Sequence, residues 1–252
     1  MISNNLLNYV LALGDDRLIL SHRLAEWCGH APILEEDIAL TNVSLDILGQ
    51  SILFYKYAAE LEGNDKNEDY YAYKRNEVEF KNLLLVEQPN EDFAFTMTRQ
   101  FYFDAFEIFF YEELAKSNNP ELKAIAEKSI KETKYHVRHS SQWMLRLGDG
   151  TEESNRRVQE ACDYLWMYVG EMFTNLPEEK ELIEAGIIPD NSLLMDKWFD
   201  FVINVKKEAG IKLQHPNAFM QKGGRLGSHT ENLGHILAEM QYLPRAFPNA
   251  KW

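Results

Sequence analysis

The sequence predicts an all-α protein: a single domain over residues 1–252 that forms a bundle of four long helices, with additional helices toward the C-terminus. Two observations lead to this prediction. Apolar residues recur at helical spacing over long stretches, whereas the sequence has neither strand-like alternation nor a repeat of fixed period. The 252 residues, 45% of them hydrophobic, also suffice to fill one sizeable core.

Chain-breaking residues bound the first two long helices. The first is expected from about Asn5 to Gly29, where Gly-His-Ala-Pro interrupts it, and the second from about Leu34 to Leu61, before Glu62-Gly63-Asn64. At 1.5 Å per residue each helix would be roughly 35 to 40 Å long. Helices of this length with a short connection normally pack antiparallel, so the two should cover each other's apolar faces.

The third and fourth long helices are expected after a less regular stretch. The third should begin near Asn90 or Glu91, because Asn, Glu and Asp favour a helix N-terminus, and should reach about Lys116. The fourth should begin at Asn119-Pro120, an N-cap followed by proline at the first helical position, and end at Gly148. Further helices are expected at about 151–173, 191–208 and 229–243, the last of them stopped or kinked by Pro244.

The charge and the cysteines exclude several classes of function. A formal charge of -14 repels polyanions, so we expect no nucleic-acid binding. Cys28 and Cys162 lie far apart in sequence and suggest neither a disulfide framework nor a zinc finger. The N-terminal segment does not resemble a secretory signal, and no stretch reaches the ~20 apolar residues of a membrane span. We therefore expect a cytoplasmic protein with no membrane partner.

The third predicted helix carries two carboxylates in an otherwise apolar segment, residues 101–111. A helix that is apolar all round is buried all round. Asp104 and Glu107 lie three residues apart and so share one face, where unpaired carboxylates are unfavourable. They could pair with basic side chains. Alternatively, the chain is a ferritin-like four-helix bundle, whose carboxylate-lined core is the kind that holds two iron or manganese ions.

A metal-binding bundle would need Glu-x-x-His on the fourth helix, because a three-residue step places carboxylate and imidazole side by side. His136 is present, but position 133 is threonine. Glu132 is one position off, about 100° around the helix, and could approach His136 only from the side. His136 could equally be a hydrogen-bonded core histidine. One stripe is expected on this helix: Ser129, Thr133, His136, Ser140, Trp143 and Leu147.

The first two helices add one acidic candidate each. Asp46 lies on the packing stripe of the second helix, and the three-residue step from it reaches Gly49, where a complete site would need histidine. Glu26 could point inward or remain exposed at the end of the first helix. Two irons need about six protein ligands in this architecture. We therefore predict no metal site and no catalytic residue, with these residual candidates only: Glu26, Asp46, Asp104, Glu107, Glu132 and His136.

A glycine-rich segment, residues 223–229, is a weaker candidate for a ligand site. It has the glycines of a phosphate loop, but no strand precedes it and it lacks the Gly-Lys-Ser/Thr ending, so a P-loop is not expected. As a turn that precedes a helix N-terminus, it could still bind an anion or contact a partner chain.

Several segments resemble a known family. The resemblance spans nearly the whole chain and is carried by Glu26–Pro32, Leu45–Gln50, Asn82–Asn90, Gly227–Gly234 and Leu237–Leu243. These segments are similar to the C subunit of the bacterial phenylacetyl-CoA epoxidase, also called the ring-1,2-epoxidase.

The resemblance implies a role within a larger complex. In that family a related A subunit is catalytic and holds the di-iron centre and the CoA-thioester substrate, a reductase subunit delivers electrons, and molecular oxygen epoxidises the aromatic ring. The C subunit is the structural partner of this catalytic subunit. The resemblance therefore implies a hetero-oligomer with the catalytic and reductase subunits, in aerobic phenylacetate degradation, with the di-iron centre in the partner and no cofactor in this chain.

Two other functions remain open from the residues alone. One is a di-iron or di-manganese carboxylate oxidoreductase in its own right, with an irregular ligand set. The other is a stand-alone helical binding protein that uses residues 223–229 as its ligand site.

Overall fold

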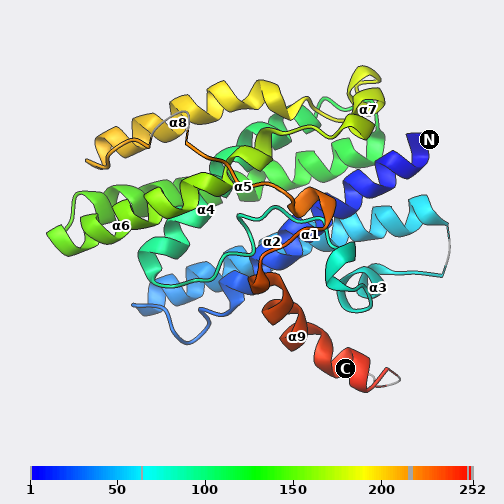
Figure 1. Ribbon diagram of the computed structural model, residues 1–252, viewed down its shortest axis with the longest axis horizontal. Helices are drawn as coiled ribbons and strands as arrows, with labels where there is room; N and C mark the ends of the chain where they lie inside the picture. The colour runs from blue at the N-terminus through cyan, green and yellow to red at the C-terminus, as the bar shows by residue number, and fades with distance from the viewer. Residues whose placement is uncertain (1, 64, 215–217, 249, 251–252) are drawn as a thin grey trace. The chain divides into compact units, whose positions relative to one another are not determined.

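The computed structural model describes residues 2–63, 65–214, 218–248 and 250, and these residues form helices and turns with no strand (Figure 1). The prediction of an all-α protein is confirmed. The chain divides into two compact units. Unit 1 comprises Met1–Pro89 and Gly223–Trp252, and unit 2 comprises Asn90–Lys222.

Unit 1 is built on two long helices that lie side by side, α1 (Ile2–Ala25) and α2 (Leu34–Glu62) (Figure 1). Ser44 donates to the Ser21 carbonyl and Ser51 to the Gly14 carbonyl, each at 2.8 Å. From the first contact to the second, the residue number increases along α2 and decreases along α1. The two helices are therefore antiparallel, as expected. Helix α1 ends four residues before Gly29, while α2 ends close to the predicted place, at a left-handed Gly63 (φ 66°).

The remainder of unit 1 consists of short segments: α3 (Glu68–Tyr73), η1 (Glu77–Glu79), η6 (Gly224–Leu226) and α9 (Glu231–Ala246). The prediction that Pro244 stops or kinks the last helix is wrong in one respect, because α9 continues through it to Ala246. Pro244 lies in the final turn, where a missing N–H removes only one hydrogen bond. Contacts to α3 hold that turn: Lys74 Nζ donates to the Pro244 carbonyl at 2.9 Å, and Arg245 Nε to the Tyr73 carbonyl at 3.1 Å.

Unit 2 contains the two other long helices, α4 (Phe93–Leu114) and α5 (Pro120–Gly148). The start of α5 agrees with the prediction, because the Asn119 side chain accepts hydrogen bonds from the N–H groups of residues 121 and 122. Helix α4 begins slightly later than expected, where Asp92 accepts from the Phe95 N–H at 2.8 Å. The described helices that follow are α6 (Glu152–Leu165), α7 (Lys180–Glu184) and α8 (Met195–Glu208), with 3-10 turns between them.

The helix expected over residues 151–173 is shorter than predicted. It ends at Leu165 and continues as two 3-10 turns, η2 (Trp166–Tyr168) and η3 (Gly170–Phe173). The Met167 carbonyl accepts from the Gln221 N–H at 2.7 Å, so it is engaged outside the helix ladder. A Cβ at Gly170 would lie 3.0 Å from Met220, which shows how closely this distant segment approaches the turn.

Helix α2 is long and apolar enough to cross a membrane by length and composition. Of its most apolar 18 residues, 44% are buried within the structure. Core helices of soluble proteins can have the same length and apolar composition. The packing of α2 against α1 accounts for one side of this apolar surface.

Candidate functional site

Asp104 lies in the middle of α4 and is 1% exposed, as the apolar segment around it predicts. Each of its carboxylate oxygens accepts one hydrogen bond: Oδ1 from Gln100 Nε2 at 2.6 Å and Oδ2 from Ser140 Oγ at 2.7 Å. Burial raises the pKa of Asp104 to about 6, although the charge of nearby His136 and the two hydrogen bonds oppose the rise. Neutral donors and partial protonation therefore accommodate this carboxylate within unit 2.

Helix α5 presents a buried polar stripe to the same neighbourhood. Ser129, Thr133, His136 and Ser140 are all buried, as predicted. The stripe continues through Met144 and Gly148, whereas the expected Trp143 and Leu147 are half-buried. The reason is the helical period, since a step of four residues from Ser140 reaches Met144 on the buried side.

The six candidate ligands are placed unequally by the structure. Asp104, Glu107 and His136 are buried in unit 2, and Glu132 is half-buried on the flank of α5. In unit 1, Asp46 is half-buried on α2. Glu26 lies beyond the end of α1 with its side chain 42% exposed, where Arg23 Nη1 donates to it at 2.9 Å.

The donors of unit 2 fall short of a two-metal site. Both oxygens of Asp104 already accept side-chain hydrogen bonds, and the Thr133 hydroxyl, at the position of the missing glutamate, donates to the Ser129 carbonyl at 3.1 Å. In the part of the chain that the structure describes, no three His, Cys, Asp or Glu side chains are grouped so that they could hold a metal ion. The arrangement therefore resembles a polar core more closely than a ligand set.

Two adjacent aspartates on α1 organise unit 1, and neither was among the candidate residues predicted from the sequence. Asp15 accepts from the Tyr55 hydroxyl at 2.6 Å, the Lys81 N–H at 2.8 Å and the Arg75 guanidinium. Burial alone would lower the pKa of Arg75, but the Asp15 carboxylate raises it above its ordinary value. Asp15 thus fixes the segment after α3 to the middle of α1.

Asp16 fixes the segment before α9 in the same way. Arg225 donates to both of its carboxylate oxygens, at 2.9 and 2.7 Å, and the Leu83 N–H donates at 2.8 Å. Burial raises the pKa of Asp16, and the Arg225 charge opposes that rise. The arginine of the glycine-rich segment is therefore engaged inside unit 1.

The histidine of that segment is engaged as well. His229 Nδ1 lies 2.9 Å from Glu87 Oε2 and its Nε2 lies 2.9 Å from the Phe80 carbonyl oxygen, with both side chains fully buried. Because both partners are acceptors, the geometry favours an imidazolium that donates twice. Burial alone would lower the pKa of His229, but its hydrogen bonds to Glu87 and Phe80 raise it above 6.5.

Glu87 also holds the start of α9. Its Oε1 accepts from the Thr230 N–H at 2.6 Å, and its Oε2 accepts from Asn82 Nδ2 at 2.8 Å. A carboxylate at a helix N-terminus is stabilised by the helix dipole. Two of the segments that carry the family resemblance, 82–90 and 227–234, are therefore joined through one buried carboxylate, which gives them a structural role.

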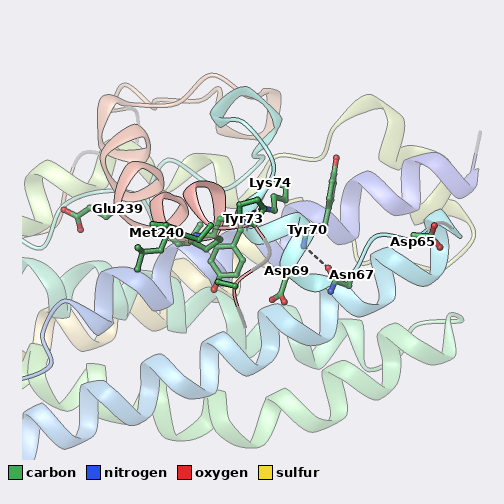
Figure 2. Close-up of a pocket in the computed structure, with 13 residues that line it drawn as sticks. Asp65, Asn67, Asp69, Tyr70, Tyr73, Lys74, Glu239 and Met240 are labelled. Atoms are coloured by element: carbon green, nitrogen blue, oxygen red, sulfur yellow. Dashed lines mark hydrogen bonds between the residues drawn. The ribbon is translucent and has the colours of Figure 1, made fainter. Parts of the chain in front are cut away.

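Unit 1 has a pocket between α3 and α9, with a volume of about 650 Å³. Figure 2 shows Tyr70, Tyr73 and Lys74 of α3 and its C-terminal end on one side and Glu239 and Met240 of α9 on the other. The dashed line marks the Tyr70 N–H donating to Asn67 Oδ1 at 3.1 Å, which is the N-cap of α3. The described lining combines aromatic, aliphatic and acidic side chains with one lysine, and it includes no histidine or cysteine.

The fold and the sites thus define a helical protein with buried, hydrogen-bonded polar groups in each unit. The family described as phenylacetic acid catabolic protein matches residues 2–252, and the chain belongs to that family. One relative is the C subunit of the 1,2-phenylacetyl-CoA epoxidase of Escherichia coli (strain K12). It is 46% identical over 249 residues, which cover 99% of this chain and 100% of the relative.

Proposed function

We propose that this chain is the non-catalytic, structural subunit of a phenylacetyl-CoA epoxidase and that it stabilises the di-iron catalytic subunit. The observation that carries the proposal is the 46% identity to the C subunit of such an epoxidase over the full length of both chains. Identity at this level over full length supports a shared place in the same complex. The chain would accordingly act in phenylacetate catabolism through contact with its partners.

The polar core supports the non-catalytic part of the proposal. The ferritin-like bundle that we propose for this chain could hold two irons only with about four carboxylates and two histidines. In unit 2 the hydrogen-bonded Asp104, the threonine at position 133 and a single buried histidine on α5 do not make such a set. We therefore assign no cofactor to this chain and place the di-iron centre in the catalytic A subunit.

The proposed partners are the catalytic subunit, which pairs with this chain directly, and the reductase subunit within the same complex. We assign the complex to the cytoplasm, and the free thiols Cys28 and Cys162 support a reducing compartment. A formal charge of -14 supports the absence of nucleic acid among the partners.

Co-expression with the catalytic subunit tests the proposal. We expect the two chains to co-purify in a fixed ratio, and we expect the catalytic subunit to lose stability and epoxidation when this chain is omitted. A catalytic subunit that is equally stable and equally active without this chain would contradict the proposal. A chain that never co-purifies with it would favour an independent binding protein.

A further inference from the structure

Helix α2 carries a largely apolar stripe that runs from Leu34 to Ile52 and is exposed at three of its six positions. Leu34 is 71% exposed, Ile38 53% and Leu45 59%, and Thr41, Leu48 and Ile52 are half-buried on the same side. We call these six residues the α2 stripe. The opposite side of the helix carries Leu40, Val43, Ile47 and Phe54, all buried.

The spacing of the α2 stripe matches a helix–helix seam. Residues 34, 38, 41, 45, 48 and 52 alternate steps of four and three, which is the heptad repeat that one helix presents to another. A Cβ added at Gly49, beside the stripe, would have nothing within 4 Å. A small residue at such a position allows a neighbouring backbone to approach closely.

We propose that the α2 stripe is the surface on which a helix of the catalytic subunit docks. This inference rests on the proposed function, because the partner is the one that the proposed complex requires. The flank of the stripe is mainly acidic, because Glu35 and Glu60 are exposed and Asp46 is half-buried. The helix has a single basic residue, the exposed Lys56. The docking helix should therefore carry an apolar heptad seam flanked by lysine or arginine.

Two other occupants fit the stripe less well. A second copy of this chain would place a second acidic flank, with its own exposed Glu35 and Glu60, beside the first. A membrane would have to accept Asp46 near the middle of the helix, together with Gln50, which is buried in unit 1. The hydrogen bonds of Ser44 and Ser51 to α1 also keep α2 within its hairpin.

A matched pair of substitutions tests the surface. Leu45→Glu places a charge in the centre of the stripe, and Leu193→Glu places the same charge on a leucine of unit 2 that is 71% exposed. Both leucines are exposed, so the isolated variants should keep the unfolding temperature of the wild type. Affinity for the purified catalytic subunit is then measured by calorimetry for each chain.

We expect Leu45→Glu to weaken binding by about 30-fold or more, as for a central interface residue. Leu193→Glu should stay within about threefold of the wild type, and Leu45→Met should bind nearly as tightly as the wild type. If the wild type binds and Leu45→Glu binds equally well, the α2 stripe is not the interface, while the proposed function stands. If the wild type fails to bind, the proposed function fails and this inference fails with it.

The alternative occupants give different results. A wild-type chain that dimerises in sedimentation, with Leu45→Glu monomeric and its binding to the catalytic subunit unchanged, would assign the stripe to self-association. Loss of binding to phosphatidylglycerol vesicles in Leu45→Glu, again with unchanged binding to the catalytic subunit, would assign it to a membrane. Either result overturns the proposal.

Discussion

Replacing Asp104 by asparagine should remove a pH-dependent loss of stability. Burial raises the pKa of Asp104 from 3.8 to about 6. Between these two values the folded protein binds more protons at this group than the unfolded chain does, so stability falls as the pH rises through this window. A rise of about two pKa units corresponds to a loss of about 3 kcal/mol at neutral pH, as an order of magnitude.

The comparison of two variants isolates this contribution. Asparagine has nearly the shape of a protonated aspartate, so Asp104→Asn should match the wild type near pH 4 and exceed its stability by up to about 3 kcal/mol at pH 7. Urea unfolding from pH 4 to 7.5 measures the difference. Asp200→Asn, at an exposed position of α8, should show a difference from the wild type that hardly changes with pH. A constant difference for Asp104→Asn as well, or a variant less stable than the wild type at pH 7, would refute the reasoning.

Four further substitutions, one of them a matched control, test other parts of the structure. His136→Ala should leave epoxidation by the assembled complex largely intact, and lost turnover with normal assembly and unfolding temperature would contradict the non-catalytic role. Arg75→Met should reduce stability by about 3 to 5 kcal/mol because it leaves the Asp15 carboxylate buried without its cation, and urea unfolding that shows less than 1 kcal/mol would contradict the importance of this pair. Gly148→Ala should reduce stability by about 1 to 3 kcal/mol, because its Cβ would lie 2.2 Å from the Ala209 carbonyl oxygen. As the control, Gly49→Ala should leave stability unchanged or slightly higher in thermal melts, because the added Cβ would have nothing within 4 Å. A similar loss of stability in both glycine variants would argue against a steric conflict at position 148.

Local signals in the sequence predicted much of the fold. The Asn119-Pro120 start of α5 and the end of α2 at Gly63 depend on residues within one helical turn, and the structure places both close to the prediction. The burial of Asp104 followed from the apolar residues around it. These features are set by neighbours in the chain, so a single sequence contains the information.

Features that depend on distant partners could not be predicted in this way. Asp15 meets Arg75, 60 residues away, and Asp16 meets Arg225, 209 residues away. The composition of α1 does not indicate which residues these aspartates contact. The signal available was two adjacent acids in the middle of an apolar helix, which by the rules of burial already required cations.

The exposed side of α2 shows a second limit of pattern reasoning. The first two helices were expected to cover each other's apolar faces, but α2 also carries apolar residues on the side opposite its buried face. Leu34 and Leu45 are nevertheless exposed, because the hairpin with α1 covers only one side of the helix. The sequence pattern predicts that a helix face is apolar, but it does not predict which segment or partner chain packs against that face.

The iron bound by this chain when it is purified alone tests the central claim most directly. After anaerobic loading with ferrous iron and removal of the excess, we expect less than one tightly bound iron per chain and no oxygen consumption with phenylacetyl-CoA and a reductant. Two irons per chain, with oxygen-dependent turnover of the thioester by this chain alone, would contradict it.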